Sequence, residues 1–473
     1  MPSYLEHAKS YFDQRAPSRR YWKSRSRCYH RSMEDFIRFL IPPGKSVLEI
    51  GCSTGELLAA ARPSRGVGVD ISPKMLELAA AKYPDYRFIE GDAHHLPLEE
   101  KFDYVILSDT VGNLWDVQRC FEQLHKVTTP RSRIVITYYN KLWYPFLCIA
   151  EALRMKSPAG SQNWLSIADL DNLLHLAGFE TVKRGMRFLF PFSVPWLTPL
   201  FNRILANLPV LNRLCLVQYV VAKPIHRPNE KVPSAYSVSV IVPTLNEAGN
   251  IEGAITRVPP MSRHVETIFV DGRSTDGTVE KIQEMIARYP DRDIKFATQK
   301  GKGKADAVFQ GFDVASGDIL MILDSDLTMP PEDLPKFYEA LASGAGELIN
   351  GCRLVYPMEK EAMRTLNYLA NHFFSLAFTW LLGQRIKDTL CGTKVLFKSD
   401  YEEIKRNRSF FGDFDPFGDF DLLFGAAKLN LKIVDLPIRY RERVYGDIKI
   451  HRFRHGLLLV RMCAFAARKI KFI

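Results

Sequence analysis

The sequence lacks most of the features that assign a protein to a class at a glance. Its eight cysteines are scattered and no two are separated by two residues, which argues against a disulfide framework or a cysteine-rich zinc site. No uninterrupted apolar run reaches the length of a membrane span, because Asn367, Asn371 and His372 interrupt the best candidate at 366–382. Residues 1–20 lack the apolar core of a signal peptide. We therefore predict a cytoplasmic protein, peripheral on the cytoplasmic face of the membrane.

The length of the chain and its net charge limit the number of domains and the classes of ligand to be expected. A chain of 473 residues is too long for one ordinary core, so two domains are expected. The formal charge of +11 suits nucleic acid, an anionic membrane surface or phosphorylated ligands, but no known nucleic-acid recognition motif accompanies it. The stretch AKPIHRPNEKVPSAY holds three prolines and few apolar residues. It predicts a linker over 225–236 that joins domains at 1–224 and 237–473.

Short apolar runs alternate with helical patterns on both sides of this linker. SVLEIG, GVGVDIS, DYVILSD and RIVITYY precede it, and SVSVIVPT, TIFVDG, IKFATQ and ILMILDSD follow it. Strands that alternate with helices are typical of parallel sheets covered on both faces. We expect two α/β, doubly wound domains.

In the first domain, VLEIGCSTGELLAAA passes from a predicted strand through Gly51 and Gly55 into a predicted helix. Glycines at such a turn let a ligand approach the backbone closely. Asp70 ends the next predicted strand, where an acidic side chain can bind the two hydroxyls of a ribose, and Asp92 lies on a later loop. The spacing differs from the GxGxxG of dinucleotide-dependent dehydrogenases.

These residues resemble the first motifs of the class I S-adenosylmethionine-dependent methyltransferases over roughly residues 20–224, with Ser53 at the middle glycine. The resemblance implies a Rossmann-like fold and S-adenosyl-L-methionine as cofactor. It implies these binding roles: Glu49, Gly51 and Gly55 at the methionine end, Asp70 at the ribose, Asp92 beside the adenine, and Asp109 closing the pocket. The acceptor stays open, with Tyr29, His94 and His95 as candidates to assist a hydroxyl. A domain that serves only binding or structure is the alternative.

Residues 189–214 lie between the last two predicted strands of this domain and are rich in apolar side chains. They are too apolar for a free loop and too interrupted to span a bilayer. Three interpretations remain: a cover for an apolar acceptor, a membrane contact, or core packing.

In the second domain, the stretch ILMILDSDLTMPP at 319–331 begins with an apolar run that is followed by two aspartates. In an extended segment Asp324 and Asp326 would point to the same side, because side chains alternate with a period of two. Two close carboxylates repel unless a cation lies between them. Oxygen ligands favour Mg²⁺ or Mn²⁺ over zinc, so the pair predicts a metal site.

Other polar residues lie at the ends of predicted strands or beside glycines in this domain. They are Asn246, Glu247, Asp271, Lys302, Lys304 and Asp306. Because the ligand crevice of an open α/β sheet lies at the carboxyl ends of its strands, we expect them to form a site for a nucleotide with a charged diphosphate.

This set resembles the family 2 glycosyltransferases with the GT-A fold over about residues 236–450, and among them the polyprenyl- and dolichyl-phosphate sugar transferases. The resemblance implies nucleotide-sugar binding by Pro243, Glu247, Asp271, Lys304 and Asp306, and metal binding by Asp324 and Asp326. It places Arg353 near phosphate or sugar, and Asp388 and Lys394 on the acceptor side. Asp421 takes the position at which the family has a glutamate on a helix. Gly272 and Ser325 depart from the family pattern without removing a metal-ligand carboxylate.

The acceptor decides whether a base is needed. A phosphate monoester has its second pKa near ~6, so it attacks without losing a proton. A sugar hydroxyl needs a carboxylate base such as Asp419 or Asp421. We predict inverting transfer to polyprenyl phosphate or a lipid-linked glycan. The alternative is transfer to a glycan hydroxyl in cell-surface polysaccharide synthesis.

The C-terminal residues favour an anionic membrane surface. Arg454, Arg461 and Arg468 recur every seven residues and would lie along one face of a helix. A basic amphipathic helix of this kind binds anionic lipids, whereas a packed terminal helix is the alternative. A third interpretation of the chain, as a membrane-binding protein without catalysis, leaves the paired aspartates unexplained.

Overall fold

The computed structural model describes residues 2–158, 160, 162–225, 236–356, 365–407, 419–443, 445 and 452–472, without the side chains of 2, 3, 365–369, 419 and 452–456. The chain divides into two compact units after residue 225. The predicted linker lies outside the described residues at 226–235.

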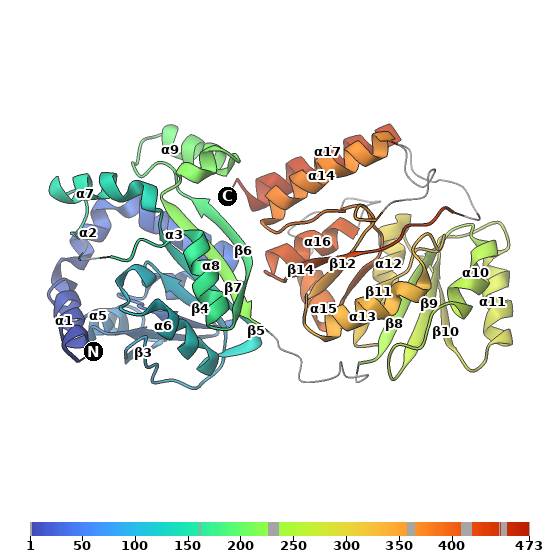
Figure 1. Ribbon diagram of the computed structural model, residues 1–473, viewed down its shortest axis with the longest axis horizontal. Coiled ribbons are helices and arrows are strands. Elements are labelled where there is room, and N and C mark those ends of the chain that lie inside the picture. Colours follow the sequence, from blue (N-terminus) through green and yellow to red (C-terminus); the bar gives the residue numbers. More distant parts are fainter. Residues whose placement is uncertain are drawn as a thin grey trace. The chain divides into compact units, whose positions relative to one another are not determined.

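The first unit is built on one seven-stranded sheet with the order β3-β2-β1-β4-β5-β7-β6 (Figure 1). Its strands are β1 Ser46–Ile50, β2 Arg65–Asp70, β3 Arg87–Glu90, β4 Phe102–Ser108, β5 Thr128–Tyr139, β6 Phe179–Arg187 and β7 Val217–Pro224. Strand β7 runs antiparallel to β5 and β6, and the other neighbours are parallel. The strand order reverses between β1 and β4, which places a ligand crevice at their carboxyl ends.

Helices connect these strands and cover the sheet. They are α1 Pro2–Asp13, α2 Arg19–Arg25, α3 Arg27–Leu40, α4 Glu56–Ala60, α5 Pro73–Lys82, α6 Val117–Gln123, α7 Tyr144–Ala152, α8 Ile167–Leu176 and α9 Leu197–Pro199. Short 3-10 or π turns are η1 Ala16–Ser18, η2 Val111–Asn113, η3 Leu124–Lys126, η4 Lys141–Trp143, η5 Leu200–Ile204, η6 Leu205–Asn207 and η7 Leu211–Leu214.

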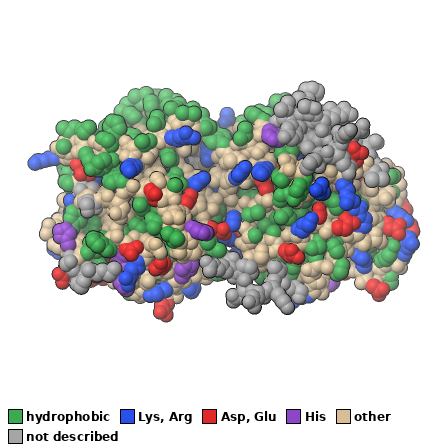
Figure 2. All heavy atoms as spheres, viewed as in Figure 1, with side chains coloured by type: hydrophobic (Ala, Val, Ile, Leu, Met, Phe, Trp, Pro, Cys, Tyr) green, Lys and Arg blue, Asp and Glu red, His purple; other side chains and the backbone are tan. Residues whose placement is uncertain are grey.

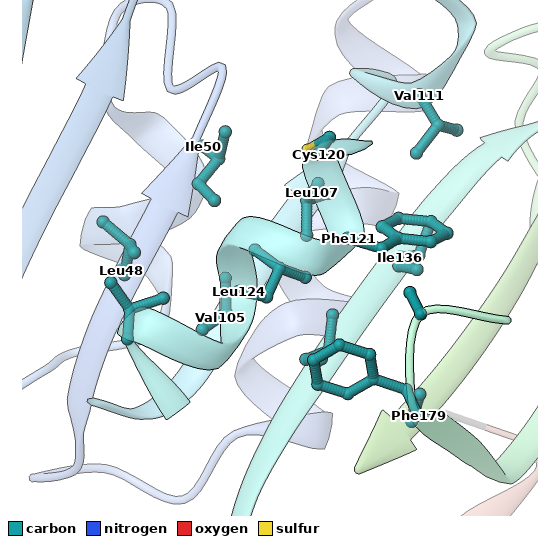
Figure 3. Close-up of a cluster of buried hydrophobic side chains, with 14 of the residues drawn as sticks. Leu48, Ile50, Val105, Leu107, Val111, Cys120, Phe121, Leu124, Ile136 and Phe179 are labelled. Atoms are coloured by element: carbon teal, nitrogen blue, oxygen red, sulfur yellow. The ribbon is translucent and has the colours of Figure 1, made fainter. Parts of the chain in front are cut away.

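Alternate residues of the strands pack in two cores, one on each face of the sheet. Leu48 and Phe121 belong to one core (Figure 3). Val47 belongs to the other, with Phe36 and Ile37 of α3. A fully buried side chain of this size contributes about 1.5–3 kcal/mol relative to an exposed one. The strand ends that carry the first site therefore rest on a rigid, two-sided core.

The second unit has its own seven-stranded sheet, with the order β10-β9-β8-β11-β13-β12-β14. Its strands are β8 Val238–Thr244, β9 Val265–Asp271, β10 Asp293–Thr298, β11 Ile319–Ile322, β12 Leu348–Cys352, β13 Lys394–Phe397 and β14 Ile433–Pro437. Strand β13 runs antiparallel to β11 and β12, and the other pairs are parallel. The prediction of two α/β domains with mainly parallel sheets is thereby confirmed.

The helices of this unit are α10 Ile251–Thr256, α11 Thr278–Arg288, α12 Gly303–Val314, α13 Leu334–Ala342, α14 Thr365–Leu382, α15 Lys398–Arg406, α16 Asp419–Lys428 and α17 Arg452–Ile470, with 3-10 turns η8 Ala248–Asn250 and η9 Pro331–Asp333. Two parallel strand–helix connections, β8-α10-β9 and β9-α11-β10, form the edge of the sheet on which the nucleotide-binding residues were expected.

The predicted C-terminal helix forms as α17 and packs on α14. Leu459, Met462 and Ala466 are buried, whereas Leu457 and Val460 are exposed. The helix therefore has a packed face and a second apolar face at the surface. None of the helices in the described part of the chain combines the length and hydrophobicity that crossing a bilayer requires.

Candidate functional sites

The first site is a cavity of about 800 Å³ at the carboxyl ends of the strands in the first unit. Gly51, Asp70, Asp92 and Asp109 line it together, each at or just beyond the end of a different strand. Residues of α1, α2 and α7 also line it. The volume lies in the range of about 300–1,000 Å³ that is usual for ligand pockets.

The turn after β1 takes its shape from Gly51, which has a φ of 74°. A Cβ here would lie 2.5 Å from Oγ1 of Thr110, so glycine is required. Ser53 also has a positive φ, of 50°, and its N–H donates a 2.7 Å hydrogen bond to Oδ2 of Asp70. The N–H of Ser72 donates to Oδ1 of Asp70 at 2.9 Å. Two turns thus fix Asp70 at the cavity wall, and burial raises the pKa of its carboxyl.

Glu49 and Gly55 lie outside the lining of this cavity. The buried Glu49 accepts a 2.9 Å hydrogen bond from the N–H of Leu58 in α4, and burial raises the pKa of Glu49 to about 8. Gly55, with a φ of 76°, starts α4 and packs against the rings of Phe88 and Tyr83. Both residues support the turn from behind, and their place at the methionine end stays a prediction.

Asp92 is held on its loop by the histidines that follow it. Its Oδ1 accepts a 3.0 Å hydrogen bond from the N–H of His94 and lies 2.6 Å from Nδ1 of that ring. Nε2 of His94 lies 3.1 Å from the N–H of Asp116, which requires Nε2 to be the acceptor and assigns the proton to Nδ1. His95 is exposed and lies outside the lining. His94 therefore positions Asp92, with both ring nitrogens occupied.

Asp109 and Tyr29 form a second pair inside the cavity. The Tyr29 hydroxyl donates a 2.6 Å hydrogen bond to Oδ2 of Asp109, while Oδ1 has no hydrogen-bond partner among the described residues. Burial raises the pKa of Asp109 to about 6, although the bond from Tyr29 opposes this shift. A carboxyl group that titrates near neutral pH beside a ligand cavity is suited to accept a proton.

Several lining residues carry no sequence signal. Tyr4 and Tyr11 of α1 and Arg19 of α2 line the cavity, although the family resemblance begins only near residue 20. Nε of Arg19 donates a 3.2 Å hydrogen bond to Oγ of Ser53. This wall depends on where the N-terminal helices pack, and no local motif specifies that contact.

The second site lies at the carboxyl ends of strands in the second unit. Oδ1 of Asp324 lies 2.5 Å from Nζ of Lys304. Gly392 lies directly against both groups, since a Cβ there would overlap the carboxylate and the ammonium. Burial alone would raise the pKa of Asp324, but the charges of Lys304, Lys394 and Arg353 lower it. The carboxylate is thereby kept ionised.

Asp326 is paired with a different base. Its Oδ2 lies 2.5 Å from Nη2 of Arg443, and Nη1 of Arg443 lies 3.9 Å from Oε1 of Glu247. The hydroxyl of Thr328 donates a 2.8 Å hydrogen bond to Oδ1 of Asp326. Arg443 thus lies between two acids that the sequence assigns to metal and nucleotide binding.

The two aspartates lie in a turn. Strand β11 ends at Ile322, the N–H of Leu327 donates to the carbonyl of Asp324 at 3.1 Å, and Leu327 has a φ of 52°. The prediction of an extended segment at Asp324 and Asp326 is therefore wrong, because the chain turns as soon as the strand ends. Alternation with a period of two does not apply in a turn.

The carboxylates suit a divalent ion whose coordination a substrate completes. Within the described residues, no group of three or more His, Cys, Asp or Glu side chains is arranged to hold a metal ion. Mg²⁺ needs only one or two carboxylates when phosphate oxygens and water supply the remaining ligands. Asp324 and Asp326 fit that pattern, provided that Lys304 and Arg443 exchange partners when the ion binds.

The expected nucleotide-binding acids hold the turns in which they lie. Asp271, the last residue of β9, accepts hydrogen bonds from the N–H groups of Arg273 and Ser274, at 2.8 and 2.9 Å. Oε2 of Glu247 accepts a 2.8 Å hydrogen bond from Nδ2 of Asn250. Both acids are buried at neighbouring strand ends.

The glycine loop before α12 is held in a similar way. Asp306 accepts a 2.8 Å hydrogen bond from the N–H of Gly301, and Lys302 is exposed just before the helix. Pro243 lies inside β8, one residue before its end. Lys304, in the first turn of α12, reaches across to Asp324.

Arg353 and Asp388 form a buried ion pair. Nε and Nη2 of Arg353 donate to the two carboxylate oxygens of Asp388 at 2.7 and 2.8 Å. Asp388 was expected to face the acceptor with Lys394, but both side chains are fully buried, and Nζ of Lys394 donates to the carbonyl of Cys391 at 2.6 Å. The structure thus gives Asp388 the role of orienting Arg353, whose guanidinium lies over the ring of Tyr440.

The candidate bases lie on α16. Asp421 is buried, at 6% exposure, and the side chain of Asp419 lies outside the described residues. Arg443 belongs to a run of arginines at 439, 441 and 443, and no motif in the sequence marks it as a site residue. The N–H of Arg441 donates to the carbonyl of Thr328 at 2.9 Å, which places this segment across the aspartate turn.

Comparison with known proteins assigns both domains. Residues 41–178 match the family model described as "Methyltransferase domain", and residues 239–404 match the model described as "Glycosyl transferase family 2". The chain therefore carries a methyltransferase domain followed by a family 2 glycosyltransferase domain.

The second domain resembles the dolichol-phosphate mannosyltransferases. The protein of that name from Pyrococcus furiosus is 41% identical over 218 residues, which cover 45% of this chain and 59% of the relative. Undecaprenyl-phosphate 4-deoxy-4-formamido-L-arabinose transferase from Aeromonas hydrophila is 32% identical over 111 residues, which cover 23% of this chain and 34% of the relative. The chain thus spans less than two thirds of the length of either protein. A solved magnesium protoporphyrin IX methyltransferase from Synechocystis is 20% identical, with a TM-score of 0.34, over 46% of this chain and 97% of that one.

Proposed function

We propose that the second domain transfers a sugar from a nucleoside diphosphate to polyprenyl phosphate or a related lipid-linked acceptor. The observation that carries the proposal is the pairing of Asp324 with Lys304 and of Asp326 with Arg443 at one strand edge. These four side chains supply the charges needed to bind a divalent ion and a diphosphate together. The names of the relatives, which act on dolichol phosphate and undecaprenyl phosphate, support the acceptor class.

The chemical task is to stabilise charge on the leaving diphosphate. A bound Mg²⁺ or Mn²⁺ would supply positive charge there. Asp324 and Asp326 would hold the ion, which releases Lys304 and Arg443 to bind phosphate oxygens. Arg353, oriented by Asp388, adds a third cation close to Asp324. One in-line displacement by the acceptor inverts the anomeric configuration.

The position of Asp421 favours a phosphate acceptor over a sugar hydroxyl. A hydroxyl needs a base within hydrogen-bond reach, whereas a phosphate dianion needs none. Asp421 is 94% buried in α16, and a base for a hydroxyl would have to be open to the acceptor.

We also propose that the first domain transfers a methyl group from S-adenosyl-L-methionine. Gly51 and Ser53 leave backbone room for the donor, Asp70 is placed for the ribose hydroxyls, and Asp92 for the adenine. Asp109 would accept the proton of the methyl acceptor, with Tyr29 holding its carboxylate. The three carboxyl groups and the turn glycine come from four strand ends and line one cavity, which supports binding of the donor and the acceptor side by side.

The surface helices of the second domain support a peripheral place on the cytoplasmic face of the membrane. Phe373 and Leu376 of α14 and Leu457 and Val460 of α17 are exposed. Arg461, Arg468 and Lys469 of α17 are exposed as well. Exposed apolar residues beside basic ones suit an anionic bilayer surface.

A donor screen tests the sugar transfer. Nucleotide sugars would be offered with dolichyl phosphate or undecaprenyl phosphate and Mg²⁺ or Mn²⁺, and products would be identified by mass. We expect a polyprenyl-phosphate sugar that disappears when the metal is chelated. A product that forms equally well with chelator would overturn the metal role, and products formed only on free glycans would overturn the acceptor.

Calorimetric titration with S-adenosylmethionine tests the first domain. We expect saturable heat from the intact chain and its loss in Asp70→Ala. If the intact chain gives no heat, the domain does not use this cofactor.

A further inference from the structure

The methyltransferase domain carries a large apolar surface that its fold leaves unburied. This apolar surface consists of residues 141–156 and 192–214. Fifteen of the 28 exposed large hydrophobic side chains in the described part of the chain lie in these two segments. Figure 2 shows hydrophobic side chains gathered where Figure 1 places α7 and α9. Trp196 and Val210 are 89% and 78% exposed. Contiguous apolar surface on this scale marks a site of contact with a membrane or a partner.

The two segments are joined into one surface. Nε1 of Trp143 donates a 2.8 Å hydrogen bond to the carbonyl of Leu214. The side chain of Asn140 donates to the carbonyls of Arg213 and Cys215 at 3.1 and 2.9 Å. These hydrogen bonds hold the start of the first segment next to the end of the second, so the apolar side chains of both segments belong to one surface.

Charge identifies the occupant of this surface. Its exposed basic residues are Lys141, Arg154, Arg203 and Arg213. Its only acid, Glu151, is paired with Lys156 at 2.7 Å. Exposed tryptophan, phenylalanine and leucine among basic residues match the apolar boundary and anionic headgroups of a bilayer.

The apolar surface also leads into the methyl-donor cavity. Phe146 and Leu153 of one segment and Phe192 of the other line the cavity that holds Asp109. A lipid resting on the surface would therefore find an apolar path to the proposed reaction site. A protein bound at the same place would cover that path.

We propose that the apolar surface docks this domain on an anionic bilayer, and that the methyl acceptor is a membrane lipid that enters the cavity between α7 and Phe192. The second part rests on the proposed methyl transfer. In that reaction the acceptor's oxygen or nitrogen forms a bond to the methyl carbon as the sulfur–carbon bond breaks. The acceptor's proton passes to Asp109, and S-adenosylhomocysteine leaves.

Quenching of tryptophan fluorescence tests the docking on the full chain. The probe is vesicles of phosphatidylcholine and phosphatidylglycerol with brominated acyl chains, which quench only tryptophans that reach them. The contribution of Trp196 is obtained by subtracting the emission of Trp196→Phe. We expect it to lose roughly half of its intensity or more, because an interfacial segment lies at the depth of the upper acyl chains.

Trp115 provides the matched control. It is 67% exposed on the same domain but lies outside the apolar surface. Its contribution, from Trp115→Phe, should keep its intensity. If the vesicles bind and Trp196 is unquenched, the membrane contact belongs to α14 and α17 alone and the proposal fails. If Trp196→Ser abolishes a dimer in sedimentation and leaves vesicle binding unchanged, the surface is instead an interface between copies of the chain.

Transfer of labelled methyl groups tests the acceptor. The full chain would be incubated with S-adenosylmethionine labelled in its methyl group and with the lipid extract of membranes from the source cells. We expect label in the organic phase, and a several-fold loss in Phe192→Asp. Label found only in water-soluble products, or none in the lipid phase while the donor still binds by calorimetry, overturns the lipid acceptor. Absence of donor binding overturns the proposed methyl transfer instead.

Discussion

The two sites hold their carboxylates in opposite ways. In the first domain, backbone N–H groups of neighbouring turns bind Asp70 and Asp92. In the second, Asp324 and Asp326 are paired with Lys304 and Arg443, which come from distant parts of the chain. Acids held by their own backbone are ready to accept hydroxyl or amino groups of a nucleoside without rearrangement. Acids that are paired with Lys or Arg must exchange these partners when a ligand binds. Such an exchange suits a ligand made of a cation, which binds the acids, and an anion, which binds the basic side chains.

The largest effect is expected from the second site. Asp326→Asn keeps an oxygen for Thr328 but removes the charge that faces Arg443. We predict a loss of sugar transfer of ~10²–10³-fold, since removing one electrostatic contact to a transition state commonly costs this much. Initial rates with polyprenyl phosphate measure it. The control Asp333→Asn, which removes an ion pair with Lys336 in the same domain, should keep full activity. Equal losses in both variants would contradict the role of Asp326.

A smaller effect is expected in the cavity of the first domain. Asp70→Asn places an amide N–H₂ group against one of the N–H groups of Ser53 and Ser72. A hydrogen bond to a charged group is worth about 1.5–3 kcal/mol, so binding of S-adenosylmethionine should weaken by ~10–100-fold. Calorimetry measures the change, with the exposed Asp85→Asn as control. Sugar transfer by the second domain should be unchanged. If Asp70→Asn also lowered the rate of sugar transfer, the two sites would not be independent.

Removing the Tyr29 hydroxyl should shift the pKa of Asp109. Tyr29→Phe deletes the hydrogen bond that lowers the pKa of Asp109, so this pKa should rise above its value of about 6. The carboxyl resonance of Asp109, followed by NMR in protein labelled at aspartate, reports the shift. An unchanged midpoint would show that the hydroxyl does not hold the carboxylate in solution.

The smallest effect is expected on stability. A glutamate titrates near 4.5 in the unfolded chain and Glu49 near 8 in the folded one, so the folded state binds the extra proton between these values. Stability contributed by this group must therefore fall as pH rises from 4.5 to 8. Glu49→Gln, which can still accept from Leu58, should flatten that fall.

Thermal unfolding at about pH 6.5 and pH 8 measures this slope, above the titration of Asp109 near 6. The relevant transition is the one that S-adenosylmethionine raises. Lys23, whose pKa burial lowers to about 8, affects stability mainly above this window, and Glu56, at about 2, below it. Equal slopes in both proteins would mean that Glu49 is ionised in the fold.

The sequence predicts those features of the fold and the sites that depend on residues close to one another in the chain. Apolar runs with glycine at their ends predict strands followed by turns, and parallel strands bring their ends together whatever lies between. This is why Gly51, Asp70 and Asp109 share one cavity. The same reasoning does not reveal the hydrogen bond between Glu49 and Leu58, because that contact depends on how α4 packs behind the strand.

The remaining differences come from contacts between distant residues. Asp388 follows a family motif, yet its orientation is set by Arg353, 35 residues away. Arg443 reaches Asp326 across 117 residues. The wall that α1 and α2 add to the cavity depends on helix packing. No local pattern encodes such pairings, so the members of each site are more predictable than their partners.

Gly392 leaves room for one charged pair of the second site. It lies on the loop before β13, the strand that runs antiparallel to its neighbours, and the Asp324 carboxylate and the Lys304 ammonium occupy the space that a side chain at this position would need. Any larger residue at position 392 would compete with the carboxylate and the ammonium for the same space, so the Asp324–Lys304 pair depends on a glycine 68 residues after Asp324.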